Sequence, residues 1–465
     1  MRQRAVHLVL LLVTIHLRIS AAQLTDKPLL LPGRPLPGGG GSVSAAVAGD
    51  AADERAGYFA IPGTQRRLFY WYFQARNVSS GAPIANAPLI AWLQGGPGCS
   101  SLFGLFFENG PYTINETLGL VPNPNTWAAA ANMLYIDSPV GTGLSYSASS
   151  AADGSTTELD VAKTLTAFFQ AFYRAPQYAA LAKSRLILAG ESFAGHYIPA
   201  AAAYMRAYAP SLPLYGVAMG NPWTNSPSQY ESYPAFALAK GLISQAQFNK
   251  VQESVTSCKL LSALCSGLDP GACDSASNTC EYKVWSATLN SDGFAYKNVY
   301  NLKQTNCVDP NDCYAPLDSR LEQYINANRA KLGAPADLVY KSCSDPPYWS
   351  LWNDMTKSYD DLVAALLDSG TSVMVYSGDE DFVCNSLGTS KWVNALLWSK
   401  QQAWSGVKTQ AWSGGTFRRL GPLSFVRVAR AGHMVPMDQP TAALQLIQQW
   451  LAGGQPVPLK ARARQ

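Results

Sequence analysis

Short apolar runs alternate with amphipathic stretches through most of the chain, and this alternation predicts an α/β fold. Buried strands are predicted at the apolar runs, residues 68–73, 89–93, 133–136, 186–188, 373–376 and 425–428. Helices are predicted where apolar positions recur at helical spacing, at residues 159–182, 196–209 and 441–451. Strands that alternate with helices indicate a largely parallel sheet with helices on both faces.

The N-terminal region lacks this pattern. Residues 1–22 have a basic start, an apolar middle and small residues near position 22, which is typical of a cleaved secretory signal peptide. A membrane anchor is the alternative, but His16 and Arg18 interrupt an apolar run that is short for a bilayer span. Residues 23–52 are rich in Pro, Gly and Ala, and we interpret them as a flexible linker or a short pro-segment.

The middle third interrupts the α/β pattern with cysteines. Six of the nine cysteines fall between residues 258 and 313, among Ser, Asp, Asn and Gly. They predict a disulfide-stapled cap insertion at residues 225–345, with a core at 53–224 and 346–455 and a tail at 456–465. Zinc binding is the alternative, but a paired C-x-x-C and a nearby histidine are missing. Glycosylation sequons at Asn77 and Asn115 agree with passage through the secretory pathway.

Charge excludes some classes of partner. Only 14% of the residues are charged, and the formal net charge of +4 includes three arginines of the predicted signal peptide. The remaining body is near neutral and lacks the basic face that nucleic-acid binding requires. After residue 22, apolar runs are too short for stable membrane insertion.

Residues 186–195, LILAGESFAG, predict a strand, a tight turn that carries Ser192, and a helix. In this nucleophile-elbow arrangement, small residues let the backbone turn sharply and the serine hydroxyl projects at the helix N-terminus. The strict pattern has glycine two residues after the serine, where this chain has Ala194 followed by Gly195. Ser192 is therefore the candidate nucleophile of an α/β-hydrolase.

The chain offers few partners for Ser192. Of four histidines, two lie in the predicted signal peptide, which leaves His196 and His433 as candidate bases. His196 lies on the elbow helix and is expected to pack in the core, whereas His433 fits the α/β-hydrolase order of serine, acid, histidine. The acid is expected after the strand at 373–376, where the residue pattern leaves Asp379 and Asp381 both open.

Four ordered segments resemble the hallmark motifs of the serine carboxypeptidase family, of which carboxypeptidase Y and cathepsin A are members. They are QGGPGCSS at 94–101, GESFAG at 190–195, GDEDFVCN at 378–385 and AGHMVPMDQP at 431–440. By motif position, the resemblance implies Ser192 as nucleophile, Asp381 as orienting acid and His433 as base. It also implies an oxyanion hole built from the backbone N–H groups of Gly96 and Phe193.

The resemblance further implies a site for the free C-terminal carboxylate of a peptide, formed by Gln94, Gly95, Glu108 and Glu191. Two glutamates suit an anion only if one keeps its proton, because close carboxyls do not both ionise easily. Peptide cleavage is therefore expected to be best at acid pH. Most relatives have Asn in place of Gln94, so carboxylate affinity or side-chain preference is expected to differ.

The family motifs also imply a pocket for the leaving residue, lined by Phe103, Phe107, Val383, Cys384 and Met434. Its apolar character suggests a preference for a hydrophobic C-terminal residue, although ordinary core packing is the alternative for these side chains. The implied disulfides are Cys99–Cys343, Cys258–Cys280, Cys265–Cys273 and Cys307–Cys313. Cys384 is then a free thiol near the site, where bulky thiol reagents are expected to inhibit.

These features together predict an α/β-hydrolase core with a cap, acting as a secreted or lysosomal/vacuolar serine carboxypeptidase on peptide or protein C-termini. No metal and no cofactor are implied, and a homodimer is left open. The alternatives are an acyltransferase and a binding or stabilising protein on the same fold. Plant acyltransferase relatives generally carry Asp in place of Glu191, and a general esterase or lipase has no evident need for Glu108 and Glu191.

Overall fold

The computed structural model describes residues 27–28, 53–76, 87–149, 153–267, 271–310 and 312–453. The predicted signal peptide, nearly all of the segment 23–52, the sequon at Asn77 and the tail 456–465 lie outside the described residues. Asn115, in the second sequon, is exposed between β5 (Tyr112–Ile114) and β6 (Leu120–Pro122). Among the helices of the described residues, none is both long enough and apolar enough to cross a membrane.

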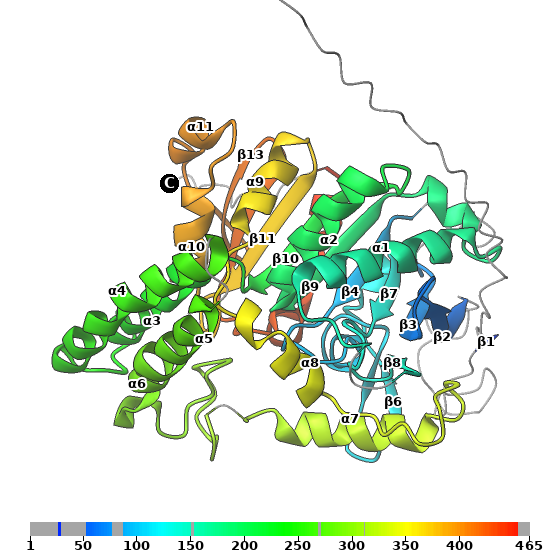
Figure 1. The fold of residues 1–465 in the computed structure, drawn as a ribbon, viewed down its shortest axis with the longest axis horizontal. Coiled ribbons are helices and arrows are strands. Elements are labelled where there is room, and N and C mark those ends of the chain that lie inside the picture. Colours follow the sequence, from blue (N-terminus) through cyan, green and yellow to red (C-terminus); the bar gives the residue numbers. More distant parts are fainter. Residues whose placement is uncertain are drawn as a thin grey trace, which may run out of the picture.

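A twelve-stranded sheet runs through the molecule (Figure 1), in the order β1-β2-β3-β7-β4-β9-β10-β11-β14-β13-β12, with β8 paired to β3. Its six central strands pair in parallel: β7 (Asn132–Ile136), β4 (Leu89–Leu93), β9 (Leu186–Ser192), β10 (Leu214–Pro222), β11 (Ser372–Gly378) and β14 (Leu423–Val428). The flanking strands pair antiparallel: β1 (Lys27–Pro28), β2 (Glu54–Ala60), β3 (Arg66–Phe73), β8 (Tyr146–Ser147), β12 (Gln410–Trp412) and β13 (Gly415–Leu420). The predicted, mostly parallel sheet is confirmed.

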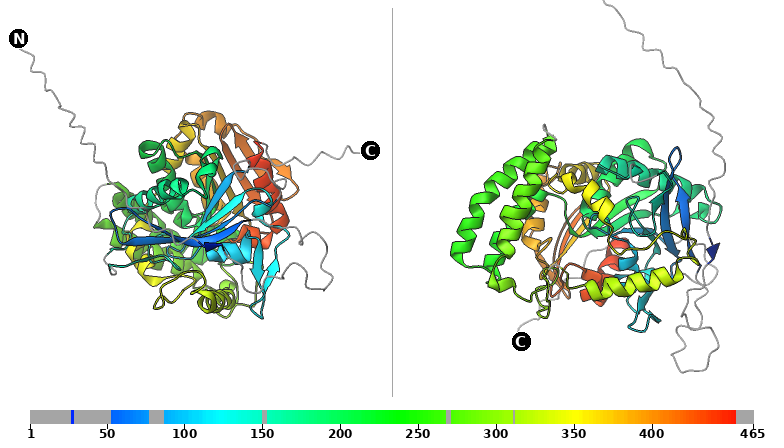
Figure 2. Two further views of the ribbon diagram at one scale, coloured as in Figure 1. Left: turned by 90° about the vertical axis from the view of Figure 1, so that its right-hand side faces the viewer. Right: turned by 60° about the horizontal axis from the view of Figure 1, so that its bottom comes forward.

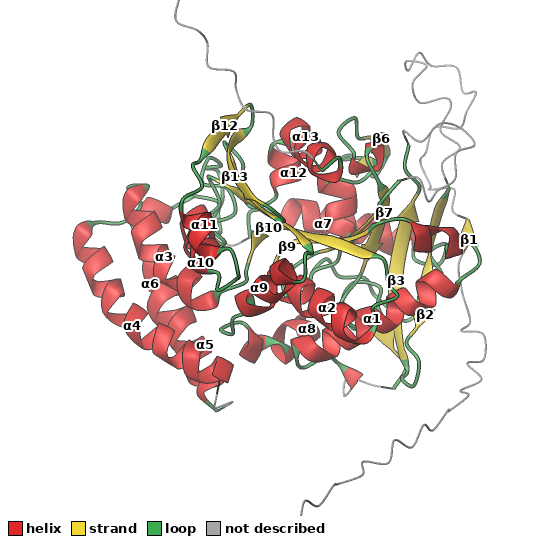
Figure 3. Ribbon diagram, turned by 90° about the horizontal axis from the view of Figure 1, so that it is seen from above, coloured by secondary structure: helices red, strands yellow, loops and turns green. Residues whose placement is uncertain are grey.

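Helices cover both faces of this sheet (Figure 3). In β4, Leu89, Ala91 and Leu93 join the core beneath α1 (Glu158–Arg174), α2 (Ala194–Tyr208) and α9 (Asp360–Asp368). Ile90 and Trp92 point to the opposite core, which packs against α13 (Pro440–Leu451). Every residue of β4 is buried, as expected for a strand covered on both faces.

Between β10 and α9 the chain leaves the sheet, and we call this segment the cap (Figure 2); the predicted bounds of the cap insertion, 225–345, remain a prediction. Its helices are α3 (Ser226–Ala239), α4 (Gln245–Gly267), α5 (Ala272–Asn278), the π-helix η6 (Thr279–Ser286), α6 (Ala287–Leu289), α7 (Ala315–Asn328) and α8 (Asp345–Ser350). The four implied disulfides are all present. Cys99–Cys343 ties the end of the cap to the loop after β4.

The helix predicted at 159–182 is wrong at its C-terminal end. α1 ends at Arg174. Ala175 is extended because the ring of Pro176 disfavours helical backbone at the residue before it. A separate 3₁₀ helix follows at Ala179–Lys183. The strand β10 has no counterpart in the predicted elements, since glycines and a proline break up the apolar run LYGVAMGNP.

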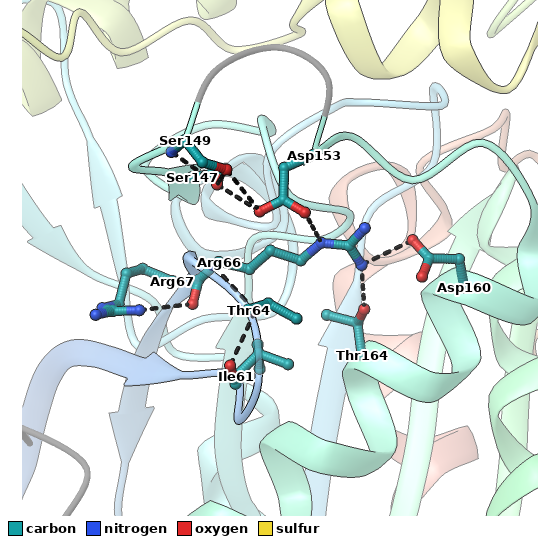
Figure 4. A network of polar contacts seen from close by, with 9 residues as sticks. All are labelled: Ile61, Thr64, Arg66, Arg67, Ser147, Ser149, Asp153, Asp160 and Thr164. Atoms are coloured by element: carbon teal, nitrogen blue, oxygen red, sulfur yellow. Dashed lines mark hydrogen bonds and ion pairs between the residues drawn. The ribbon is translucent and has the colours of Figure 1, made fainter.

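Arg66 anchors β3 to α1 at the edge of the fold (Figure 4). Its Nη1 donates to Asp160 Oδ2 at 2.7 Å and to Thr164 Oγ1 at 2.9 Å, and its Nε donates to Asp153 Oδ1 at 3.2 Å. Ser147 Oγ donates to the other oxygen of Asp153 at 2.6 Å. A single guanidinium therefore joins β3, α1 and the loop between β8 and α1.

Candidate active site

Ser192 is the last residue of β9 and has a φ of 61°, a left-handed conformation that is uncommon for a residue with a side chain. A Cβ on Gly190 would lie 2.1 Å from Leu93 O, and one on Gly195 would lie 2.7 Å from Trp223 O. Both neighbouring strands therefore approach the turn too closely for larger residues. The predicted strand–turn–helix around Ser192 is present.

Asp381 and His433 meet at the carboxyl edge of the same sheet. Asp381 follows β11 and His433 follows β14, and Asp381 Oδ2 lies 2.9 Å from His433 Nδ1. Both side chains are buried. Asp379 instead pairs with Arg427 at 2.7 Å on the surface, so the geometry separates the two aspartates that the residue pattern left open.

Asn221 was missed in the sequence. It lies near the end of β10 and its Nδ2 donates to Asp381 Oδ2 at 2.6 Å, while its Oδ1 accepts from Gly378 N at 3.2 Å. The backbone N–H of Cys384 donates to the same aspartate oxygen at 3.1 Å. Asp381 is thus held by two donors besides His433, which fix its orientation.

Cys384 lies inside this cluster. It is free and buried, and the side chain of Ser192 is a hydrogen-bond partner of its thiol. A carboxylate oxygen of Asp381, the sulfur of Cys384 and a ring nitrogen of His433 all lie within 4.8 Å of one another. Burial, together with the nearby Asp381 charge, raises the pKa of the thiol well above its usual value, so the thiol is neutral.

The glycine-rich loop after β4 packs directly on the elbow. A Cβ on Gly95 would lie 2.5 Å from Phe193 N and 2.6 Å from Ser192 Cβ. Gly96 has a φ of 109° and precedes a cis peptide bond to Pro97. A side chain at position 95 would clash with the elbow, so the loop packs directly against Ser192 and Phe193.

Gln94, Glu108 and Glu191 form one buried cluster beside the elbow. Trp92 Nε1 donates to Gln94 Oε1 at 2.9 Å, which leaves Gln94 Nε2 to donate to Glu191 Oε1 at 2.7 Å and to Glu108 Oε1 at 3.2 Å. Glu108 ends the π-helix η2 (Gly104–Glu108), and π-helical turns often occur at functional sites.

Burial favours the protonated form of both glutamates. Burial raises the pKa of Glu108 to about 7. Burial and the Glu108 charge raise the pKa of Glu191 well above its usual value. The second carboxyl oxygen of each is buried without a hydrogen-bond partner. The pair can therefore offer a hydrogen bond to an incoming carboxylate.

The remaining predicted residues fall into two groups. Phe103, Phe107 and Met434 are buried, and the rings of Phe103 and Phe107 lie 5.2 Å apart, while Val383 is only partly buried. His196 is fully buried between Phe193 and Tyr359, and burial lowers its pKa to about 3. His196 is therefore a neutral packing residue, as expected.

The fold and the elbow define an α/β-hydrolase. A profile of the serine carboxypeptidase family matches residues 47–453. A serine carboxypeptidase-like protein of Oryza sativa subsp. japonica is 36% identical over 411 residues, covering 86% of this chain and 92% of its own. Carboxypeptidase Y of Candida albicans is 34% identical over 428 residues, covering 87% and 74%.

A solved structure agrees with these relatives. Kex1(delta)p, described as a prohormone-processing carboxypeptidase from Saccharomyces cerevisiae, superposes with a TM-score of 0.74 at 25% identity, covering 86% of this chain and 91% of its own. The chain belongs to the serine carboxypeptidase family of hydrolases.

Proposed function

We propose that the protein releases C-terminal, preferably hydrophobic, amino acids from peptides through an acyl-enzyme on Ser192, and that acid pH favours this reaction. The observation that carries the proposal is the buried cluster in which Gln94 bonds both Glu108 and Glu191 beside the elbow. A general esterase needs no such pair, whereas an enzyme that selects a free carboxylate does.

Ser192, Asp381 and His433 have separate roles in the proposed reaction. His433 accepts the proton of Ser192 as the hydroxyl attacks the scissile carbonyl, and returns that proton to the leaving amine. Asp381 holds Nδ1 of the ring, so Nε2 is the nitrogen that takes the proton of Ser192 in this proposal. A water then repeats the sequence and frees the acyl group.

Stabilisation of the intermediate falls to the backbone. The N–H groups of Gly96 and Phe193 meet negative charge that exists only in the tetrahedral intermediate. A donor of this kind contributes about 3–4 kcal/mol in a comparable protease. The close packing of Gly95 on Phe193 N supports this assignment, since it places the loop of Gly96 next to the elbow.

Selection of the carboxylate depends on the glutamate pair and Gln94. Because Trp92 fixes the amide orientation, both Nε2 hydrogens of Gln94 point at the glutamates. Gln94 thus orients the carboxyl groups, and a protonated glutamate donates to the substrate. As the pH rises through about 7, Glu108 loses its proton and its negative charge repels the substrate carboxylate, so peptide binding weakens.

The preference for hydrophobic leaving residues rests on Phe103, Phe107 and Met434, which are buried and apolar. Secretion or delivery to a lysosome or vacuole fits the four disulfides, since such bonds persist in oxidising compartments. Acid lysosomes or vacuoles would match the protonated pair.

The test measures release of leucine from N-blocked Phe-Leu at acid pH, beside its C-amidated twin and the Ser192→Ala protein. We expect release from the free acid, abolition by the substitution and strong weakening by amidation. Equal rates on the acid and the amide would refute the carboxylate site. Capture of the acyl group by an added alcohol in preference to water would favour an acyltransferase.

A further inference from the structure

The segment Asn298–Leu302 of the cap reaches both loops that carry Asp381 and His433. It comes from the region between η7 (Asp292–Phe294) and α7, far in sequence from either loop. Residues 298, 299, 301 and 302 are buried. We call this segment the clamp.

The clamp brackets Asp381 on both sides. Leu302 N donates to Glu380 O at 2.9 Å, and Phe382 N donates to Val299 O at 2.9 Å. Glu380 and Phe382 are the two chain neighbours of Asp381. The backbone on either side of the acid is therefore fixed by the cap and not only by the sheet.

The same segment holds His433. The backbone N–H of His433 donates to Tyr300 O at 2.6 Å, and the two rings pack edge to face at 5.3 Å. A Cβ on Gly432 would lie 2.2 Å from Tyr300 O, so the loop that carries His433 packs closely against the clamp. Asp438, a partner of Asn301, accepts from Gly432 N at 2.7 Å and closes the loop from the other side.

Asn298 organises the clamp from within. Its Oδ1 accepts from Tyr300 N at 2.8 Å and its Nδ2 donates to Gln304 Oε1 at 2.7 Å. The first of these bonds fixes the residue whose carbonyl receives His433 N–H. Asn298 is fully buried, and its side chain hydrogen-bonds Tyr300 N and Gln304 and neither Asp381 nor His433, so it acts on these two residues through the backbone.

The disulfide Cys307–Cys313 supports the clamp from outside. Pro310, inside the loop that this disulfide closes, accepts from Val299 N at 3.1 Å. Cys307 N donates to Tyr296 O at 3.1 Å. The N-terminal end of the clamp, with the residues just before it, is thus tied to one short covalent loop.

From these contacts we infer that Asn298 is a positioning residue. We also infer that the cap fixes the position of Asp381 relative to His433. This inference rests on the proposed roles of those two residues with Ser192. The cap therefore helps to align Asp381 and His433 with Ser192. A displacement of about 1 Å in such groups typically costs about 100-fold in rate.

The direct test is the rate at which a fluorophosphonate labels Ser192, since that rate depends on the triad and not on a C-terminal carboxylate. We expect Asn298→Ala to slow labelling by about 10- to 100-fold. Asn298→Asp keeps the acceptor for Tyr300 N–H, and a flipped Gln304 amide can donate to it, so labelling should largely recover. Hydrolysis of N-blocked Phe-Leu should show the same loss in kcat with KM unchanged.

Asn326→Ala is the matched control. Asn326 lies in the same insertion and also bonds a backbone amide and carbonyl, those of Tyr340, at 2.9 Å and 3.0 Å. It touches neither loop of the triad, so urea unfolding should be easier while labelling stays at the wild-type rate. Equal labelling by the two alanine variants, or a raised KM with unchanged kcat for Asn298→Ala, would overturn the inference.

A second pair of variants tests the disulfide. Replacing Cys307 and Cys313 by serine should slow labelling, whereas replacing Cys265 and Cys273, which close another short loop of the cap, should not. If the wild type is labelled at Ser192 but does not cleave peptides, the proposed function is wrong. The labelling rates of the variants still test the effect of the clamp in that case. Equal effects of the two double substitutions would contradict the clamp.

Discussion

The buried carboxyl groups of Glu108 and Glu191 contribute more to the stability of the folded protein at acid pH than at neutral pH. A buried carboxyl whose pKa is raised by folding contributes stability below its unfolded pKa, and that contribution is lost as the pH rises through the folded pKa. For Glu108 the pKa rises from 4.5 to about 7. The window of the loss therefore runs from about pH 4.5 to somewhat above pH 7.

The magnitude follows from the same values. A rise from 4.5 to about 7 corresponds to about 3 kcal/mol of unfolding free energy at 1.36 kcal/mol for each pH unit. Glu108→Gln removes the titrating group but keeps a side chain that can bond Gln94. We therefore expect the wild type to lose about 3 kcal/mol more than the variant across this window.

The assay is urea unfolding at about pH 4.5, 6 and 8, with the disulfides intact. Glu253→Gln is the control, because Glu253 is exposed on α4 and should leave the pH dependence unchanged. If Glu108→Gln follows the wild-type curve at all three values, the two carboxyls do not hold a proton in the folded state. The account of carboxylate recognition would then be wrong.

Three further predictions concern the surroundings of the site. Asn221→Ala should lower kcat by about 10-fold or more with little change in KM, because Asp381 loses a hydrogen-bond donor at 2.6 Å. Steady-state kinetics would measure both constants, and a change in KM alone would contradict the prediction. Small thiol reagents should react slowly with Cys384 below neutral pH, as followed by mass spectrometry, because burial keeps the thiol neutral. Once attached they should inhibit the enzyme, and full activity of the modified protein would refute this prediction. Arg66→Ala should destabilise the fold by about 1–3 kcal/mol in urea. Arg67→Ala, which removes one hydrogen bond to the Arg66 carbonyl, should cost far less, and equal losses would discount the network.

The apolar pattern predicts the central strands well because their residues are buried on both faces. β4, β7 and β14 lie at or within two residues of the predicted positions. β10 escapes the pattern because its glycines are dictated by neighbours: a Cβ on Gly220 would lie 2.4 Å from the ring of Tyr376. Tertiary packing, which a single sequence does not reveal, thus overrides local preference at that strand.

The site divides in the same way. The order of Ser192, an acidic loop and His433 can be predicted, since chain order and strand–turn patterns are local. The hydrogen bonds from Asn221 to Asp381 and from His433 to Tyr300 cannot, because they join segments far apart in sequence. The pairing of Glu108 with Glu191 followed only from the family resemblance, as neither residue stands out in its local pattern.

Digestion of a peptide with a free C-terminus tests the central claim most directly. Mass spectrometry at about pH 5 should show a ladder that shortens one residue at a time from the C-terminus, fastest at hydrophobic residues, with the Ser192→Ala protein inactive. The C-amidated peptide should remain largely intact, and raising the pH through about 7 should slow the free peptide. Internal cleavage, or equal shortening of both peptides, would contradict the account.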